Sequence, residues 1–338
     1  MSDGSDTMGW SRAVWLAEVH SWIAHQLHRM GAAQSGEITQ PHVRPWATAL
    51  RVPTNRGCVW FKATMAGLVH ESAITQALSQ WIPGRTPDVL AADTDRNWLL
   101  MADGGERMRA LCQAAGDTGL ARTLHRDYAA LQQALVRRVP QMLALRTPDC
   151  RLAGFPALYL DLLCRTDMLG IGEEEGLTRE ELARLHALAP RVEAICAELA
   201  EFGIPETLQH DDLHWNNVLV RDGRLTIFDW GDSSVSHPFL SLVVLLRGAA
   251  RDLDVAVESA PIQDLRAVYL KEWNLRLSPA EMDRACLLAD ALGRISRALT
   301  WRRVVEGIRE PHRSEYIASV PGWLQEFLES PALGEIDT

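Results

Sequence analysis

The stretch from His210 to Pro238, which reads HDDLHWNNVLVRDGRLTIFDWGDSSVSHP, decides the fold of this chain. Its middle contains two short apolar runs, 218–221 and 224–228, and the dipeptide Asp222-Gly223 joins them. Apolar runs on either side of Asp-Gly are the strongest short-range signal for a β-hairpin. The sequence therefore predicts a strand, a two-residue turn and a second strand.

Oxygen-bearing side chains should meet at the open end of this hairpin. In the register that the turn imposes, Asn217 faces Phe228 and therefore lies beside Asp229. Asp212 precedes Asn217 by five residues, on an irregular segment from which a side chain can point at a substrate. A turn rich in Asp and Asn could simply satisfy its own backbone. This alternative does not explain why the acids lie at the open end of a hairpin.

The spacing His-x-Asp, four residues and Asn, followed by a strand that ends in Asp-Trp-Gly, resembles the catalytic loop and metal-binding aspartate of the protein-kinase-like fold. The segment lacks the Arg that protein kinases carry before the catalytic Asp, and no Ala-Pro-Glu follows it. The sequence therefore resembles the aminoglycoside phosphotransferase-like family of small-molecule kinases. This resemblance implies an α+β, bilobal protein-kinase-like fold, with a small β-rich N-terminal lobe containing one αC-type helix and a large, mainly helical C-terminal lobe.

The resemblance also implies roles for individual residues. Asp212 would be the catalytic base that orients the acceptor hydroxyl and receives its proton, and His210 would brace the catalytic loop. Asn217 and Asp229 would hold Mg²⁺ on the phosphates of ATP, since Mg²⁺ takes few protein oxygens and completes its shell with phosphate and water.

A second half of the site is expected around Lys62. This lysine lies in the predicted strand 58–63, and the predicted helix that follows, 68–81, carries Glu71 on its apolar stripe. Because burial of an unpaired carboxylate is costly, we expect Glu71 to pair with Lys62. By resemblance, Lys62 would then reach the α- and β-phosphates. The alternative is that both side chains are exposed, as lysines and glutamates usually are.

The segment Met101-Ala-Asp-Gly-Gly105 is the expected hinge. In the resembling family, backbone groups of this segment bind the adenine, which makes Met101 and Asp103 candidate nucleotide contacts. We expect a nucleotide-binding lobe over residues 1–103, with a leading helix, and a catalytic and acceptor-binding lobe over 104–338. Residues 39–45, between the first two strands, contain no glycine. Two alternatives therefore remain for the groups that cradle the phosphates. They are the backbone N–H groups of a short loop, or the side chain of His42 or Arg44.

Hydrophobic periodicity predicts the remaining elements. A strand pattern begins at Glu37 and includes predicted strands over 46–52, 58–63, 87–93 and 97–101, and predicted helices cover 10–30, 68–81, 122–145, 155–169, 178–201, 262–275, 281–306 and 315–328. Thr178 and Ser278 each begin a capping box. His237 is expected to cap the helix after Pro238, and Asp232 either touches the acceptor or metal or forms a turn. The C-terminal helices should wall the acceptor pocket, with Trp273, Trp301 and Asp290 as candidate lining residues.

Composition limits the classes of partner. The chain has 338 residues and a formal net charge of −10, which disfavours nucleic acid and favours a cationic acceptor. Six scattered cysteines without Cys-x-x-Cys indicate reduced, buried thiols rather than disulfides or zinc. The polar start, residues 1–9, is neither a secretory signal nor a transit peptide, and the longest apolar run, 240–246, is too short to span a bilayer. We expect a cytoplasmic protein without a membrane partner.

These observations favour an ATP-dependent phosphotransferase that uses Mg²⁺ and modifies a hydroxyl of a small molecule, such as an aminoglycoside-like compound, an amino sugar or another metabolite. One alternative is an ATP-binding pseudokinase or regulatory module of the same fold, which need not keep every site residue named above. Another is a protein kinase, which the missing Arg and the missing Ala-Pro-Glu disfavour. The identity of the acceptor, the choice between ATP and GTP and the oligomeric state stay open.

Overall fold

The chain forms two compact units. A computed structural model describes residues 9–115 and 118–334; most of the polar start discussed above, residues 1–8, lies outside this range. Among the described residues, unit 1 comprises 9–106, 219–231 and 304–315, and unit 2 comprises the others. The first unit therefore contains most of the predicted hairpin, residues 218–228.

Unit 1 is built on an antiparallel five-stranded sheet with the order β1-β2-β3-β5-β4. In the register of this sheet, Lys62 on β3 lies opposite Ala49 of β2 and Leu99 of β5. The strands are β1 (Thr39–Val43), β2 (Ala47–Thr54), β3 (Gly57–Thr64), β4 (Val89–Asp93) and β5 (Trp98–Ala102).

The edge strand β1 differs from the sequence-based expectation. The sequence predicts a connecting loop over 39–45, but most of this segment pairs with β2, and only a tight turn closed by Arg44 N–H and the Ala47 carbonyl separates the two strands. Pro41 is tolerated within β1 because an edge strand has N–H positions without a partner strand. The turn at 44–46 is therefore shorter than the loop that the sequence predicts.

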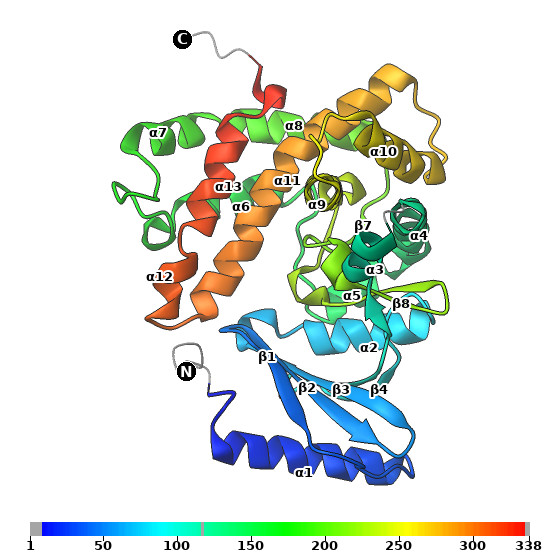
Figure 1. The fold of residues 1–338 in the computed structure, drawn as a ribbon. Helices are drawn as coiled ribbons and strands as arrows, with labels where there is room; N and C mark the ends of the chain where they lie inside the picture. Colours follow the sequence, from blue (N-terminus) through cyan, green and yellow to red (C-terminus); the bar gives the residue numbers. More distant parts are fainter. Residues whose placement is uncertain (1–8, 116–117, 335–338) are drawn as a thin grey trace. The chain divides into compact units, whose positions relative to one another are not determined.

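Two helices lie on opposite faces of the sheet, α1 (Ala13–Arg29) and α2 (Glu71–Trp81), as Figure 1 shows. The residues of α1 that recur every third or fourth position are buried against Phe61 and Trp98, whose ring centroids are 5.5 Å apart. Because neighbouring side chains on a strand point to opposite faces, Lys62 points away from this core and toward α2. The short turn η1 (Ala66–Leu68) precedes α2.

The predicted hairpin is present. It consists of β8 (Val218–Arg221) and β9 (Arg224–Ile227), and the short strand β6 (Glu106–Arg107) completes a sheet of order β6-β8-β9. Asp222 and Gly223 have φ angles of 51° and 74°, as a type I′ turn requires. The turn chemistry of Asp-Gly thus sets the local structure that the sequence predicts.

Unit 2 is mainly helical, with a two-stranded sheet of β7 and β10. Figure 1 shows the long helix α11 beside α13, and Arg294 of α11 donates to the carbonyl of Glu326 in α13 at 2.5 Å. Its helices are α3 (Met108–Ala115), α4 (Gly119–Leu135), α5 (Val139–Ala144), α6 (Phe155–Leu163), α7 (Arg179–Ala187), α8 (Ala189–Glu201), α9 (Leu242–Leu253), α10 (Ala260–Glu272), α11 (Pro279–Gly307, with 304–307 in unit 1), α12 (His312–Tyr316, with 312–315 in unit 1) and α13 (Ser319–Leu328). The strands and short turns are η2 (Val136–Arg138), η3 (Thr166–Met168), β7 (Thr207–Gln209), η4 (Trp215–Asn217), η5 (Trp230–Asp232, with 230–231 in unit 1), β10 (Ser234–Ser236), η6 (Pro238–Ser241) and η7 (Pro331–Leu333).

Prolines divide two of the predicted long helices. The segment 122–145 is split between α4 and α5, and the segment 178–201 between α7 and α8. In each case a proline occupies the first turn of the second helix, where its fixed φ is tolerated and its missing N–H would leave a hydrogen bond unmade in a continuous helix. The capping boxes at Thr178 and Ser278 are both present.

The cysteines form no disulfide, as expected. Five of them are buried or half-buried, while Cys164 is exposed, so the expectation of burial is wrong at that position. Across the described residues, no helix combines the length and the apolar character needed to cross a bilayer.

Candidate active site

Unit 1 contributes a buried ammonium group shared by two carboxylates. Lys62 Nζ contacts Glu71 Oε1 and lies 2.5 Å from Asp229 Oδ1. The side chain of Glu71 is 2% exposed and that of Lys62 is 12% exposed, whereas that of Asp229 is 46% exposed. The predicted pair between Lys62 and Glu71 is therefore present, and the alternative of two exposed side chains is wrong.

The charges of this cluster depend on one another. Burial alone would lower the pKa of Lys62, but the neighbouring Asp229 and Glu71 carboxylates outweigh it and raise that pKa above its ordinary value. Burial raises the pKa of Glu71, and the negative charge of Asp229 adds to this effect, while Lys62 opposes it. Lys62 is thus protonated, and its charge holds two acids together.

The Asp-Trp-Gly segment places Asp229 at this cation. Asp229 adopts a left-handed backbone with φ of 68°, which is uncommon for a residue other than glycine. The next residue, Trp230, is fully buried and donates its indole N–H to the carbonyl of Ile227 at 3.0 Å. A Cβ at Gly231 would lie 3.1 Å from Oε2 of Glu71. A larger residue would crowd the ion pair, so glycine is favoured at this position.

Unit 2 contributes the loop that carries Asp212. The amide nitrogen of Asn217 donates to the Asp212 carbonyl at 3.0 Å and lies 3.4 Å from Asp212 Oδ2. His214 Nε2 lies 3.5 Å from the same oxygen. Asn217 is buried, and the side chain of Asp212 is 31% exposed. Because Asn217 uses its amide nitrogen for the loop, its amide oxygen is left as the group that can accept from outside.

The donor chemistry of Asn217 and Asp229 fits Mg²⁺. An amide oxygen and a carboxylate are hard oxygen ligands, which Mg²⁺ prefers. Within residues 9–115 and 118–334, no three His, Cys, Asp or Glu side chains form a metal-binding cluster. Mg²⁺ on nucleotide phosphates usually takes few protein oxygens and completes its shell with phosphate and water.

Buried hydrogen bonds fix the start of the loop that carries Asp212. His210 is fully buried, and its backbone N–H donates to the hydroxyl of Tyr128 at 2.9 Å. Asp211 is also buried and has a φ of 65°. Its Oδ2 accepts from Ser296 Oγ at 3.1 Å and from Thr300 Oγ1 at 2.5 Å. His210 is thus buried and held through its backbone, and its role in bracing the loop stays a prediction.

Sequence reasoning missed the contribution of α11 to this loop. Arg297 of α11 is 5% exposed, and its Nη1 donates to the Asp211 carbonyl at 2.9 Å and to Asp232 Oδ2 at 3.1 Å. Its Nη2 lies 3.2 Å from Asp212 Oδ1. Burial raises the pKa of Asp211, and Arg297 opposes this shift. One feature of the sequence could have indicated this contribution. Residues 296, 297 and 300 are polar, although their neighbours on the same helix are apolar. Asp232, for which the sequence left a contact with acceptor or metal and a turn as alternatives, pairs with Arg297.

The expected hinge is an ordered turn in unit 1. Asp103 Oδ1 accepts from the N–H of Gly105 at 3.1 Å, and Asp103 Oδ2 lies 3.1 Å from Arg221 Nη2. Met101 is buried at 8% exposure. Gly105 has a φ of 98°, and a Cβ there would lie 2.2 Å from the carbonyl oxygen of Val220. The glycine lets the hinge backbone lie against β8. The nucleotide contacts of Met101 and Asp103 stay a prediction.

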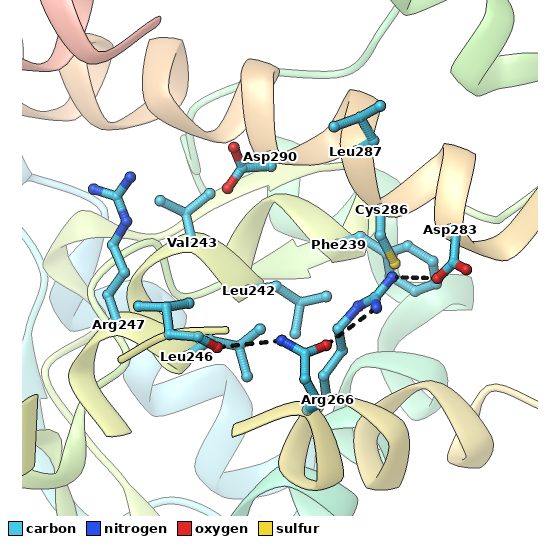
Figure 2. A pocket seen from close by; sticks show the side chains of 12 residues that line it. Phe239, Leu242, Val243, Leu246, Arg247, Arg266, Asp283, Cys286, Leu287 and Asp290 are labelled. Atoms are coloured by element: carbon cyan, nitrogen blue, oxygen red, sulfur yellow. Dashed lines mark hydrogen bonds and ion pairs between the residues drawn. The ribbon is translucent and has the colours of Figure 1, made fainter. Parts of the chain in front are cut away.

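A cavity of about 540 Å³ lies within unit 2 among η6, α9, α10 and α11. Figure 2 shows apolar side chains of α9 between Arg247 on one side and Arg266 on the other. Arg266 is paired with Asp283 at 2.8 Å. Asp290, one of the predicted acceptor-lining residues, lines this cavity. The full lining is Phe239, Leu242, Val243, Leu246, Arg247, Val257, Gln263, Arg266, Asp283, Cys286, Leu287 and Asp290.

The other candidate lining residues are packed into unit 2 outside the lining of that cavity. Trp273 is buried against Phe239, with ring centroids 6.0 Å apart. Trp301 stacks on Tyr316 at 6.1 Å. His237 caps the following turn as predicted, because its Nδ1 accepts from the N–H of Phe239 at 3.3 Å.

Comparison with known proteins places this geometry in context. The family model of the Phosphotransferase enzyme family matches residues 64–276, which is more than half of the chain. No curated protein matches the chain significantly in sequence.

Three solved structures illustrate the fold. A choline/ethanolamine kinase family protein from Mesorhizobium loti has a TM-score of 0.60 and 15% identity, covering 93% of this chain and 96% of its own. The GDP complex of aminoglycoside 2′-phosphotransferase-IIIa has a TM-score of 0.60 and 15% identity, with coverage of 91% and 97%. A macrolide 2′-phosphotransferase from Brachybacterium faecium has a TM-score of 0.55 and 16% identity, with coverage of 94% and 99%. The predicted α+β, protein-kinase-like fold is confirmed.

Proposed function

The chain belongs to the Phosphotransferase enzyme family, and from this premise we propose that it transfers the γ-phosphoryl group of ATP to a hydroxyl group of a small molecule. The observation that carries the proposal is the Lys62 ammonium, held inside unit 1 by Glu71 and Asp229. A fixed cation beside an exposed carboxylate suits a nucleotide phosphate accompanied by Mg²⁺.

Each group in unit 1 has a part in nucleotide binding. Lys62 binds the α- and β-phosphates, and Glu71 keeps the ammonium in place. Asp229, together with Asn217 of unit 2, would hold Mg²⁺, which neutralises negative charge on the phosphates when bound. The backbone of the hinge, from Met101 to Asp103, binds the adenine. The GDP complex of the aminoglycoside phosphotransferase with the same fold makes GTP the nucleotide to test beside ATP.

Asp212 acts on the acceptor. Its carboxylate orients the acceptor hydroxyl and takes the hydroxyl proton as the new oxygen–phosphorus bond forms. The bond between the γ-phosphorus and the bridging oxygen breaks, and ADP leaves with the electron pair. Little covalent work falls to the protein, so alignment of the hydroxyl and neutralisation of charge supply most of the acceleration.

The acceptor class is broad. The named activities of the proteins with this fold concern macrolides, aminoglycosides, choline and ethanolamine. The net charge of −10 supports an acceptor that carries a cation. We propose that residues 1–103 form the nucleotide-binding lobe, and that residues 104–338 form the catalytic and acceptor-binding lobe, which also supplies Asn217 and Asp229 for Mg²⁺. The six cysteines, none of which is in a disulfide, support a reducing compartment such as the cytoplasm.

A coupled ADP-release screen tests the proposal. The purified chain is incubated with Mg²⁺ and either ATP or GTP against a panel of aminoglycosides, macrolides, choline, ethanolamine and hydroxylated metabolites. We expect acceptor-dependent ADP release, with the phosphorylated product identified by mass spectrometry. EDTA and the Asp212→Asn variant serve as controls: EDTA should abolish release, and Asp212→Asn should lower its rate by orders of magnitude. Nucleotide binding without turnover of any acceptor would contradict the proposal and favour the regulatory alternative.

A further inference from the structure

Arg297 carries a charge into the interior of unit 2. Its side chain is 5% exposed, and a buried guanidinium group is costly unless several partners hold it. Nη1 donates to the Asp211 carbonyl at 2.9 Å and to Asp232 Oδ2 at 3.1 Å. The carbon of the guanidinium group lies 5.8 Å from the ring centroid of Trp323. These contacts fix the plane of the group independently of Asp212.

The remaining amino group of Arg297 meets the candidate base. Nη2 lies 3.2 Å from Asp212 Oδ1. Since a guanidinium group is planar and rigid, contacts through Nη1 determine where Nη2 points. The side chain of Asp212 is 31% exposed and is therefore the less constrained partner. Arg297 consequently sets the position of Asp212, rather than the reverse.

Both oxygens of Asp212 are then defined. Oδ1 faces Arg297, while Oδ2 lies 3.4 Å from Asn217 Nδ2 and 3.5 Å from His214 Nε2. Rotation of the carboxylate would break at least one of these contacts. These three neighbouring residues thus determine which edge of the carboxylate faces an acceptor hydroxyl.

The same helix also fixes the backbone before Asp212. Ser296 and Thr300 donate to the Asp211 carboxylate, and Asp211 has a φ of 65°, in the left-handed region. Such a conformation persists where surrounding contacts hold it. One face of α11 therefore holds the backbone of Asp211 and the side chain of Asp212 together.

We propose that Arg297 is a positioning residue for phosphoryl transfer, which aligns the Asp212 carboxylate with the acceptor hydroxyl without touching the reacting atoms. This inference rests on the proposed function, because it takes Asp212 as the base. A loss of alignment should lower turnover without weakening nucleotide binding, since small errors in geometry reduce the rate by up to about a hundredfold. A residue that only supports the fold would not produce this separation.

Two substitutions test the inference. Arg297→Gln removes the charge and the fork of donors, and Arg297→Lys keeps the charge but loses the fork. The matched control is Arg284→Gln on the same helix, where Arg284 binds Glu198 through two contacts of 2.6 and 2.7 Å. The assay is steady-state ADP release with the acceptor from the screen, with ATP hydrolysis as a second assay.

We expect kcat to fall about 10- to 100-fold in Arg297→Gln, with the KM for ATP unchanged within about twofold and partial recovery in Arg297→Lys. Arg284→Gln should keep the kcat of the unaltered protein. An unchanged kcat in a folded Arg297→Gln variant would overturn the inference, and so would equal losses in Arg297→Gln and Arg284→Gln. If Arg297→Gln does not fold, Arg297→Lys is the deciding variant. A fall in its kcat at constant KM for ATP would support the inference, and an unchanged kcat would overturn it.

A double-mutant cycle separates this inference from the proposed function. If Arg297 acts through Asp212, Arg297→Gln should add no further loss in an Asp212→Asn background. Additive losses would overturn the positioning role. Full turnover in Asp212→Asn alone would instead overturn the assignment of the base. Loss of turnover in Asp212→Asn with normal kcat in both Arg297 variants would overturn this inference alone.

Discussion

Lys62 Nζ lies 2.5 Å from Asp229 Oδ1, although 167 positions separate the two residues along the chain. Strand β3 supplies the cation, and the segment after β9 supplies the carboxylate. Glu71 of α2 contacts the same ammonium group. The three side chains form one electrostatic unit, so a change in any of them alters the environment of the other two.

Removal of the cation should destabilise the protein. In Lys62→Met the Glu71 carboxylate, which is 2% exposed, loses its buried partner, and we expect the free energy of unfolding to fall by about 3–5 kcal/mol. The double variant Lys62→Met/Glu71→Leu should recover most of this loss, because no buried charge is left unpaired. Urea denaturation at pH 7 measures both. A double variant no more stable than Lys62→Met would contradict the explanation.

Loss of the base should affect turnover and spare nucleotide binding. We expect Asp212→Asn to lower kcat by about 10²- to 10⁴-fold, the usual contribution of a general base, while the affinity for ATP measured by calorimetry stays nearly intact. Asp149→Asn is the matched control, because the Asp149 side chain is exposed and pairs with its near neighbour Arg151. Unchanged kcat in Asp212→Asn would remove Asp212 from the mechanism.

The carboxylate of Asp229 should be required for metal-dependent binding. Calorimetry of ATP binding with Mg²⁺ and with EDTA should show a clear difference for the unaltered protein. In Asp229→Ala the two affinities should become equal, because the carboxylate oxygen that binds the metal is gone. Lys62 keeps Glu71 as a partner in this variant, so the fold should survive. A metal effect of undiminished size in Asp229→Ala would exclude this residue as a ligand.

Two buried histidines should make the stability depend on pH. Burial lowers the pKa of His125 to about 4, despite the contact of its Nδ1 with the Ala121 carbonyl, and burial lowers the pKa of His237 to about 3. Below about pH 6.5 the unfolded chain binds protons at these positions and the folded chain does not, so stability falls as the pH falls. Between pH 7 and pH 5 each histidine should contribute a loss of up to about 2 kcal/mol.

The variant His125→Gln isolates one of these contributions. Urea denaturation of this variant and of the unaltered protein at several pH values gives the slope of stability against pH. We expect the slope below pH 6.5 to be smaller in His125→Gln, whatever the stability at pH 7. Equal slopes would show that His125 is protonated in the folded state.

The close approach of Gly105 to β8 should make alanine costly there. A Cβ at Gly105, with φ of 98°, would lie 2.2 Å from the carbonyl oxygen of Val220, whereas a Cβ at Gly84, with φ of 78°, would meet nothing within 4 Å. Gly84→Ala should cost about 1–2 kcal/mol from backbone strain alone. Gly105→Ala should cost clearly more by urea denaturation, because the hinge must move from β8. Similar losses in the two variants would argue against a tight contact in solution.

Local patterns were sufficient to predict much of the site. Asp222-Gly223 specifies the hairpin through its turn chemistry, and alternation along β3 separates Lys62 from the apolar core formed by Phe61 and its neighbours. The stripe of α2 that carries Glu71 follows from helical periodicity in the same way. Predictions were weaker where the local pattern was ambiguous, as in 39–45, because an edge strand that contains Pro41 has few of the usual strand signals.

The sequence by itself thus determined the hairpin, the loop with Asp212 and Asn217, and the lysine with its glutamate, because each depends on spacing within a few residues. Only the tertiary structure decided which helix holds the loop. Arg297 lies 86 positions after Asp211, and no periodicity links a helical arginine to a distant carboxylate. That contact arises because packing of α11 brings a buried guanidinium group to the acids that can neutralise it.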